Sequence, residues 1–553
     1  MPRREKKYLK IAAGIFLCLL TAACHRQPPQ HDIQKNVNEL DDNVGKDIGD
    51  IIAYLADHNG SMGDSVRVRY AGVLQTFYSA ADHKAAWSSS GKALSQADSL
   101  FDLIRHARDY GLEPSSYYAD TLARILSAVR TDSLAQRDAI QWARLDILLT
   151  DDCMKLAEGL HYGHLGRDSL SMRADSSFND SSRLALLKEA LRSGDVKARL
   201  LSLQPRILQY RQLQQALAAY NKTYGQRHWD TLPTNLSDTV LFRKMLAKRL
   251  LQSGELDSAA SGNDASVTAA LKKFQQMHDL YPDGVTGAHT LAALNVSAAE
   301  RFRQAALNLD RWRQFPDPLP DEYLLVNIPS YTMQLWRDDT VRLQSRVIVG
   351  RPDAPTPLLN SAIINFQLYP YWRVPFSIIV KEMLPAIRKN IGYLAAHNLE
   401  IIDRHNNVVD PYTLDWRKYN KHYFPYLIRQ MTGLDNSLGI IKFNFRNKYS
   451  VYLHDTNGRG LFGRSFRALS HGCVRVQQWD SLAMYLVRTD TLRHRRDSVQ
   501  KWMADEEQKL VVLNHRIPIY IRYFTCAPDA QGRLVFYEDI YGYDRPWLRR
   551  PLQ

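Results

Sequence analysis

Cys473 is the residue whose surroundings carry the clearest chemical signal. Residues 470–475 read Ser-His-Gly-Cys-Val-Arg. A cysteine thiolate is a strong nucleophile, but it requires a base that removes its proton and hydrogen-bond donors that stabilise the developing oxyanion. Gly472 allows the backbone to turn sharply just before the cysteine and to approach a substrate closely. The segment therefore predicts a nucleophilic thiol on a tight turn.

His454 is the candidate base for this thiol. It ends a predicted strand and lies 19 residues before Cys473, a gap in which a glycine-rich loop can return and bring the imidazole beside the sulfur. Arg475 follows the cysteine by two positions and adds positive potential, which lowers the pKa of a thiol. We predict that Cys473 is the nucleophile and that His454 is the general base and acid.

Other interpretations of these residues are open. A cysteine beside a histidine is usually incidental, and His471 either takes part in catalysis or holds the turn through a hydrogen bond. Cys473, His454 and His471 could also supply three ligands to a metal. No Cys-x-x-Cys pair and no acidic ligand accompanies them, so we expect neither a metal nor another cofactor.

The first 24 residues predict the compartment. Five basic residues precede a short apolar run, Ile11 to Leu20, and Thr21-Ala22-Ala23 then leads to Cys24. This is the pattern of a signal peptide, whereas a membrane-spanning helix needs about 20 apolar residues. A cysteine after small residues resembles a bacterial lipoprotein signal, which implies a lipidated Cys24. Plain cleavage and an uncleaved short anchor are the alternatives. By analogy with lipoprotein sorting, His25 in place of aspartate favours the outer membrane.

The charge and the cysteine count agree with an exported protein. The net charge is +14, of which residues 1–24 contribute +4, so the remainder carries +10. Such a surface suits anionic lipid or cell-wall polymers, although general solvation explains it equally well. Export argues against a nucleic-acid partner. The cysteines beyond the first segment are three, too few for a disulfide framework, so at least one thiol is expected to stay free: Cys153, Cys473 and Cys526.

The first half of the chain is predicted to be helical. A length of 553 residues exceeds what one hydrophobic core normally serves. Residues 25–48 are polar and are expected to form a tether. Apolar residues recur at spacings of three and four across 49–239, which predicts a helical scaffold domain. A further helix at 298–316 is expected to pack back on this scaffold, so that residues 240–296 form an inserted unit.

The inserted unit has a recognisable pattern. Residues 270–295 read ALKKFQQMHDLYPDGVTGAHTLAALN. They predict an amphipathic helix, an Asp-Gly turn and a second helix. The pattern resembles the peptidoglycan-binding type 1 domain. The matching residues are structural, so the resemblance implies the fold of residues 240–296, and retained binding of glycan stays an open question.

The second half of the chain is predicted to be rich in strands. Residues 376–435 look helical or irregular and interrupt the strands. Late strands at 517–521 and 535–537 are expected to close a β-rich domain at 322–545. The fold class is therefore α+β with several domains. Alternating β-branched and aromatic residues between turn residues predict the early strands at 323–328, 332–336, 345–349 and 362–366.

Three strings in this half resemble one enzyme family. Residues 452–476 read YLHDTNGRGLFGRSFRALSHGCVRV, which is similar to the catalytic motif of the L,D-transpeptidase (YkuD) family. The strings YPYWRVPFSIIVKEMLP at 369–385 and GLDNSLGIIKF at 433–443 also resemble the family. Together with the helical scaffold and the inserted unit, they resemble its large, YcbB-like periplasmic branch. The resemblance implies that residues 383–435 form a capping subdomain over the active site.

The resemblance implies a role for each residue of the site. Cys473 would be the nucleophile and His454 the general base and acid, while His471 and Gly472 would belong to the catalytic turn, whose backbone N–H groups form the oxyanion hole. Carbapenems would be expected to acylate Cys473. The remaining residues would contact the substrate or support the turn: Ser470, Arg475 and Tyr452.

The implied reaction is a two-step acyl transfer in cell-wall biogenesis. The thiolate attacks the carbonyl at position three of a peptidoglycan stem peptide, terminal D-Ala leaves, and an amine of a neighbouring stem then attacks the thioester to give a 3→3 crosslink. Water as acceptor, which would give an L,D-carboxypeptidase, and another amine are alternatives that the sequence does not separate. A non-catalytic wall-binding scaffold is a further alternative, against which the intact pair of His454 and Cys473 argues.

Overall fold

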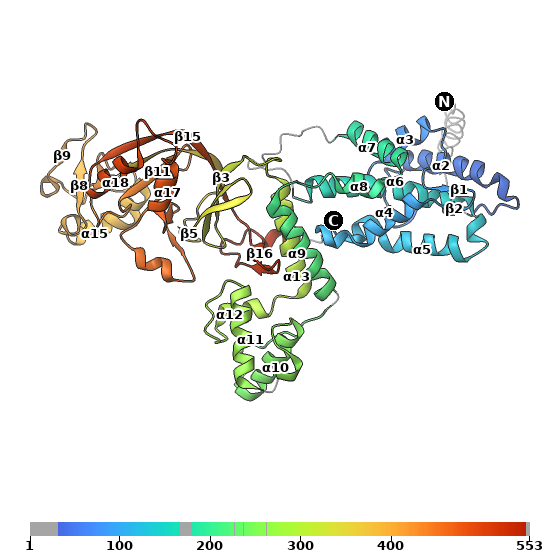
Figure 1. Ribbon diagram of the computed structural model, residues 1–553, viewed down its shortest axis with the longest axis horizontal. Coiled ribbons are helices and arrows are strands. Elements are labelled where there is room, and N and C mark those ends of the chain that lie inside the picture. Colours follow the sequence, from blue (N-terminus) through green and yellow to red (C-terminus); the bar gives the residue numbers. More distant parts are fainter. Residues whose placement is uncertain (1–30, 166–178, 226, 236, 261–262, 549–553) are drawn as a thin grey trace, which may run out of the picture. The chain divides into compact units, whose positions relative to one another are not determined.

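The chain folds into two compact units. Of the residues that the structure describes, 31–164 and 179–204 form the first unit, and those within 205–548 form the second. The predicted signal peptide and the predicted lipidation site, Cys24, lie outside the described residues. A computed structural model (Figure 1) describes residues 31–165, 179–225, 227–235, 237–260 and 263–548.

The first unit is mainly helical and is built around α6 (Ala139–Tyr162). This helix starts at Asp138, whose carboxylate accepts a hydrogen bond from the backbone N–H of Ile140 at 3.2 Å. Such a cap satisfies an N–H group that has no partner within the helix. Most side chains of α6 are buried, because the other helices pack around it: α2 (Leu40–Asp57), α3 (Ala71–Ala80), α4 (Ser95–Arg105), α5 (Ala119–Thr131), α7 (Asp180–Ser193) and α8 (Val196–Leu201).

Helix α2 corrects the predicted tether. The sequence predicted a tether over 25–48, but α2 begins at Leu40. Leu40, Val44 and Ile48 recur every four residues and are buried, with 1%, 2% and 0% of their surfaces exposed. This stripe stabilises a helix within an otherwise polar segment, so composition alone was a poor guide there.

In the second unit, α9 (Leu208–Tyr224) packs against α13 (Ala298–Arg313). Between these two helices in sequence lies a small helical domain. Its core contains Leu250, Leu271 and Phe274. Its helices are α10 (Thr239–Gln252), α11 (Asp264–Met277) and α12 (Ala288–Leu294).

The turn between α11 and α12 is organised by the buried side chain of Gln275. Its amide nitrogen donates to Asp283 Oδ1 at 2.8 Å and to the carbonyl of Val285 at 3.0 Å. Its amide oxygen accepts the backbone N–H of Gly284 at 2.8 Å. Gly284 has a φ of 78°, which favours glycine. These contacts give a structural reason for the Phe-Gln and Asp-Gly pairs of the motif.

The remainder of the second unit is the predicted β-rich domain. Among the described residues, its sheet has the strand order β13-β5-β14-β12-β11-β6-β15-β3-β4. The additional pairing of β4, the last strand of this order, with β5, the second, closes the sheet on itself. The core holds side chains from most of these strands, including Val326, Phe366 and Val474. The strands are β3 (Glu322–Asn327), β4 (Thr332–Arg337), β5 (Thr340–Gly350), β6 (Leu359–Leu368), β11 (Ile441–Phe445), β12 (Leu453–His454), β13 (Ala468–Ser470), β14 (Val474–Val476) and β15 (Lys509–Arg522).

One of the two predicted late strands lies outside this sheet. The segment 517–521 belongs to β15, which pairs with β3 and β6. The segment 535–537 overlaps β17 (Leu534–Phe536), which pairs only with β16 (Cys526–Pro528) in a separate hairpin. The prediction that it closes the domain was wrong, because alternation indicates a strand without indicating its partner.

The segment between β6 and β11 forms a lobe with its own core, here called the cap (372–430). Residues 376–435 were predicted to be helical or irregular and the cap to span 383–435. The lobe instead begins with β7 and contains a sheet of order β7-β10-β8-β9. The strands are short, which is why no alternation is visible: β7 (Trp372–Arg373), β8 (Leu399–Ile402), β9 (Val408–Val409) and β10 (Leu427–Gln430). Its helical part comprises α14 (Phe376–Ile378), a π-helical turn (Ile379–Met383), α15 (Leu384–Lys389) and α16 (Tyr393–Ala396).

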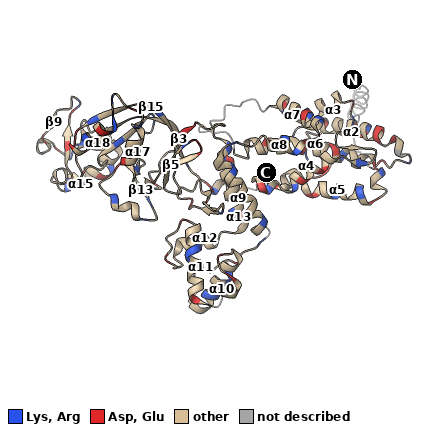
Figure 2. Ribbon diagram, viewed as in Figure 1, with Lys and Arg blue, Asp and Glu red and all other residues tan. Residues whose placement is uncertain are grey.

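Charged residues of both signs are interspersed along the helices of both units (Figure 2). Within the described part of the chain, no helix is both long and apolar enough to cross a membrane.

Candidate active site

The turn that carries Cys473 connects β13 to β14. Gly472 has a φ of 114°, a conformation that residues with a side chain rarely adopt. The hydroxyl of Ser470 accepts the N–H of Gly472 at 3.1 Å and donates to the carbonyl of Cys473 at 2.6 Å. Thr356 donates to the carbonyl of Gly472 at 2.9 Å. Hydrogen bonds on both sides therefore hold the cysteine in place.

Strand pairing brings His454 to this turn. β12 runs parallel to β14, with His454 opposite Arg475. On its other edge β12 pairs with β11, with His454 opposite Lys442. The rings of Tyr452 and His454 lie 5.6 Å apart between centroids. Strand pairing therefore places His454 next to Arg475 and Tyr452, on the strand adjacent to the one that follows Cys473.

The environment of the Cys473 thiol combines burial with several polar contacts. Tyr452 lies beside the thiol, and both its side chain and its backbone interact with the sulfur. These contacts and the charges of Lys442 and Arg475 lower the pKa of the thiol, but burial outweighs them and raises the pKa above its ordinary value. The charge of Arg475 thus lowers the pKa of the thiol, as predicted, but burial determines the direction of the net shift. Because the thiolate is the reactive form, this thiol depends on a base.

His454 is the candidate for that base. It is only 5% exposed. Burial, followed by the charge of Arg475, lowers the pKa of its imidazole to about 3. The ring is therefore neutral at physiological pH, and its Nδ1 makes no hydrogen bond of normal geometry with the described residues. A neutral imidazole with an unoccupied nitrogen can accept a proton.

Asp455, which the sequence analysis did not single out, anchors the strand beside the site. Its fully buried carboxylate accepts the backbone N–H of Ile440 at 3.0 Å and the guanidinium of Arg459 at 2.7 Å. A side chain at Gly439, which has a φ of 60°, would collide with this carboxylate. The second glycine of the family-like string at 433–443, Gly439, is therefore required for a steric reason.

His471 points to the cap. Its Nε2 lies 2.6 Å from Oε1 of Glu382, which belongs to the π-helical turn of the cap. Arg351 Nη2 is 3.9 Å from the same oxygen, and the backbone N–H of Arg351 donates to the carbonyl of Ser470 at 2.9 Å. His471 thus links the catalytic turn to the cap. No group of three or more His, Cys, Asp and Glu side chains suited to a metal occurs among the described residues.

Lys442 and Trp372 are further residues of the site that the sequence analysis missed. Lys442 Nζ lies 4.1 Å from the ring centroid of Tyr452, and burial lowers the pKa of its ammonium group. Trp372 interacts with the Tyr452 side chain and lowers the pKa of its hydroxyl, although burial raises that pKa overall. Both lie within strings quoted above for their family resemblance, at 433–443 and 369–385, and that was the only signal for them.

Substituting Lys442 with methionine is expected to move the alkylation profile of Cys473 to higher pH. The positive charge lowers the thiol pKa, so its loss raises that pKa further. The measurement is the rate of modification by iodoacetamide as a function of pH. Lys448→Met, on an exposed residue, serves as the control and should leave the profile unchanged. An unshifted profile in the Lys442 variant would show that its charge does not reach the sulfur.

Three parts of the chain match known families. Residues 321–490 match the "L,D-transpeptidase catalytic domain", residues 237–294 the "Putative peptidoglycan binding domain" and residues 72–217 the "Scaffold domain". The chain therefore carries an L,D-transpeptidase catalytic domain and a peptidoglycan-binding domain beside a helical scaffold, and the predicted family and fold class are confirmed.

One curated relative is 39% identical over 247 residues, a "Putative L,D-transpeptidase" of Haemophilus influenzae. The match covers 44% of this chain and 48% of the relative, so the chain spans about half the length of the curated relative it matches. Two solved structures are also similar, each at 11% identity over 37% of this chain. They are an Ldtfm-avibactam carbamoyl enzyme (TM-score 0.17, 49% of that chain) and a cysteine-to-serine mutant of Enterococcus faecium L,D-transpeptidase (TM-score 0.16, 50% of that chain).

Proposed function

We propose that this protein is a peptidoglycan L,D-transpeptidase that forms 3→3 crosslinks through a thioester on Cys473. The observation that carries the proposal is that strand pairing places the half-buried Cys473 thiol, directly before β14, near a neutral His454 imidazole at the end of the adjacent β12 in the catalytic domain. This combination supplies a nucleophile and a base. A wall-binding scaffold protein without enzymatic activity would not need a nucleophile and a base.

In the first step, His454 takes the proton of the Cys473 thiol and the sulfur attacks the carbonyl of the third stem residue. The tetrahedral oxyanion then collapses, the proton passes from His454 to the nitrogen of D-Ala, and D-Ala leaves. The N–H of Gly472 is already bonded to Ser470. The N–H of Cys473 is therefore the better donor to the oxyanion, while Gly472 shapes the turn.

In the second step, the amine of a neighbouring stem attacks the thioester carbonyl and the thiolate leaves. His454 now removes the proton of the attacking amine and returns it to the sulfur. Dividing the reaction at a covalent intermediate replaces one difficult step by two easier ones. The residues of this chain are common to crosslinking, to hydrolysis by water and to transfer to another amine, and crosslinking is the reaction we favour.

The decisive experiment is incubation of the purified enzyme with disaccharide-tetrapeptide, followed by mass spectrometry. A crosslinked dimer that has lost one D-Ala would support the proposal. Tripeptide without dimer would show that water is the acceptor and would replace crosslinking by carboxypeptidase activity. Adding a D-amino acid to the same reaction reveals exchange onto a different amine.

We further propose that the protein acts in the periplasm, held to a membrane by a lipid on Cys24, with its small helical domain bound to peptidoglycan. The matches to wall-related domains support the location. Mass spectrometry of the mature N-terminus tests the anchor, and an unmodified Cys24 would refute it. Sedimentation of the protein with purified sacculi tests wall binding, and absence from the pellet would refute that role.

The cap is expected to become protected from proteolysis when a carbapenem acylates Cys473. The ion pair between His471 and Glu382 joins the cap to the turn that carries the acylated sulfur, so an occupied site should favour the closed arrangement. Limited proteolysis with and without a carbapenem measures the effect within residues 383–435. Glu382→Gln should reduce the protection, whereas Glu400→Gln, in a separate ion pair with Arg429, should not. Equal cleavage with and without the inhibitor would argue against a closing cap.

A further inference from the structure

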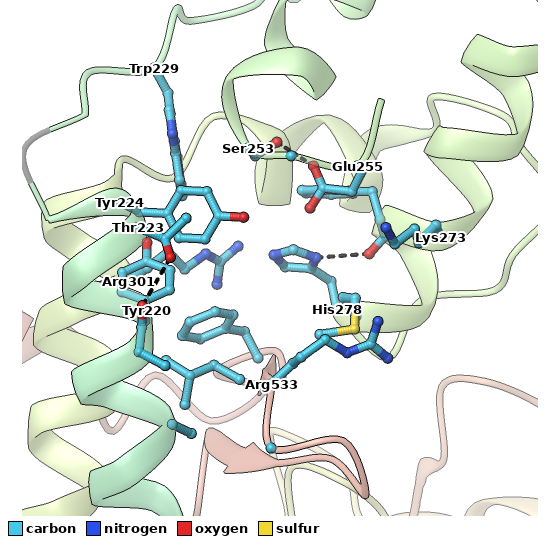
Figure 3. A pocket seen from close by; sticks show the side chains of 18 residues that line it. Tyr220, Thr223, Tyr224, Trp229, Ser253, Glu255, Lys273, His278, Arg301 and Arg533 are labelled. Carbon is cyan, nitrogen blue, oxygen red and sulfur yellow. Dashed lines mark hydrogen bonds between the residues drawn. The ribbon is translucent and has the colours of Figure 1, made fainter. Parts of the chain in front are cut away.

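A second cavity, of about 270 Å³, lies in the second unit (Figure 3). Its walls come from α9, the loop after α10, α11, α13 and the β16–β17 hairpin. None of its lining residues belongs to the site around Cys473. A cavity of this volume is large enough for one ring with a short substituent.

The walls of the cavity are aromatic. Tyr220 and Tyr224 lie 5.1 Å apart between ring centroids, Trp229 lies 6.2 Å from Tyr224, and Phe536 lies 6.2 Å from Tyr220. A side chain at Gly254 would reach within 2.7 Å of the Tyr224 hydroxyl. The glycine therefore leaves this ring free to face the cavity. Such walls favour contact with the face of a ring.

Arg301 supplies a buried positive charge at this cavity. It is 6% exposed, and its guanidinium points into the space between Tyr224 and His278 (Figure 3). It donates to Gln304 at 2.9 Å and to the carbonyl of Ala293 at 3.0 Å, and it stacks over Phe536 at 4.7 Å. Within the described residues it forms no ion pair, and its Nε has no hydrogen-bond partner.

A second buried guanidinium lies behind the aromatic wall. Arg249 is 1% exposed and stacks on Trp229 at 4.2 Å. Its Nη1 has no hydrogen-bond partner in the described part of the chain. Its Nε donates to the carbonyl of Leu294 at 2.8 Å, and the carboxyl of Glu255 interacts with its charge. Burying a cation away from an anion is unfavourable, so Arg301 is the cation at this cavity that a bound anion would stabilise.

The other titratable groups at the cavity do not provide a fully ionised carboxylate to pair with Arg301. Burial raises the pKa of Glu255 to about 7, so this carboxyl is only partly ionised at neutral pH. Burial and Arg301 hold the pKa of His278 well below its usual range, so it is neutral. Lys273 adds a positive charge, and Arg533 is paired with Asp529 at 2.7 Å.

We propose that this cavity is a binding site for a small carboxylate attached to a ring. The carboxylate would bind the guanidinium of Arg301, and the ring would lie between the tyrosines of α9 and Phe536. The acyl transfer uses none of its residues. Because α11 of the small helical domain lines the cavity, the inference rests on the proposed wall binding and deepens it by naming the chemistry of the ligand. The cavity is a binding site without a covalent step.

Isothermal titration calorimetry of the purified full-length protein tests the proposal with three probes. N-acetylmuramic acid has a pyranose ring and a free carboxylate, N-acetylglucosamine has the ring alone, and lactate has a carboxylate without the ring. The first is expected to bind about tenfold or more tightly than either of the others, because only it satisfies the cation and the aromatic walls together. Equal binding of the two sugars, or of lactate and N-acetylmuramic acid, would overturn the proposal. So would the absence of any binding.

Substitutions in and near the cavity test whether N-acetylmuramic acid binds there. Arg301→Met should weaken binding of N-acetylmuramic acid about tenfold or more. Arg303→Met, on the same helix but outside the cavity, should leave it unchanged. Because the loss of Arg301 can also disturb the fold, Thr223→Trp provides a second test. Thr223 is exposed on α9 and lines the cavity, so the larger ring should block entry without disturbing the buried cations. Unchanged affinity in the Thr223 variant would show that the probe binds elsewhere.

Discussion

Replacing Cys473 with alanine is expected to lower the rate of acyl transfer by about 10⁴-fold or more, because no thioester can form without the sulfur. The measurement is the rate at which disaccharide-tetrapeptide loses D-Ala, with the thermal unfolding midpoint recorded on the same sample. The hydrogen bonds of Ser470 and Thr356 that fix the turn go to backbone groups. The variant should therefore keep its fold while it loses its activity.

The other two described cysteines give the control for this substitution. Cys153 and Cys526 are both buried, and burial raises the pKa of each thiol, to about 12 for Cys153. Neither should react with a carbapenem, so Cys526→Ala should still show one covalent adduct by mass spectrometry. Turnover at the wild-type rate by the Cys473→Ala protein, or an adduct on it, would remove Cys473 from the mechanism.

The parts of the site that could be predicted from the sequence are local. Gly472 permits a turn that few other residues tolerate. Ser470, Gly472 and Cys473 lie within four positions, so their hydrogen bonds form within one turn. His454 could be placed because it ends a strand at a spacing that permits return of the chain. These constraints act between residues close in sequence, so a short motif is enough to predict them.

The parts that could not be predicted depend on contacts between distant segments. Glu382 meets His471 across 89 positions, and no periodicity indicates such a pair. Lys442 reaches the site only because β11 pairs with β12. The net effect on the thiol pKa could not be predicted either, since it requires the depth of burial. The strands of the cap are two to four residues long, too short to leave a pattern.

His454→Ala is the second large effect that we expect. Loss of the base should reduce the rate of acyl transfer by about 10² to 10⁴-fold, since proton transfer by a positioned group contributes that much. In the wild type, the imidazole pKa of about 3 keeps the base neutral at every pH above that value. The rate should therefore not fall between pH 7 and pH 5 on account of His454.

The variant should depend on pH in a different way. Without the imidazole, only the thiolate formed in solution can attack, and the raised pKa of Cys473 makes that species scarce at neutral pH. Its residual rate should rise with pH, up to the pKa of the thiol. The matched control is His471→Ala, which removes the contact with Glu382 and leaves His454 in place. If His471 serves the cap, its loss should be less than about tenfold and should not change the shape of the profile. Equal losses in both variants would place His471 in the proton transfer and would contradict His454 as the single base.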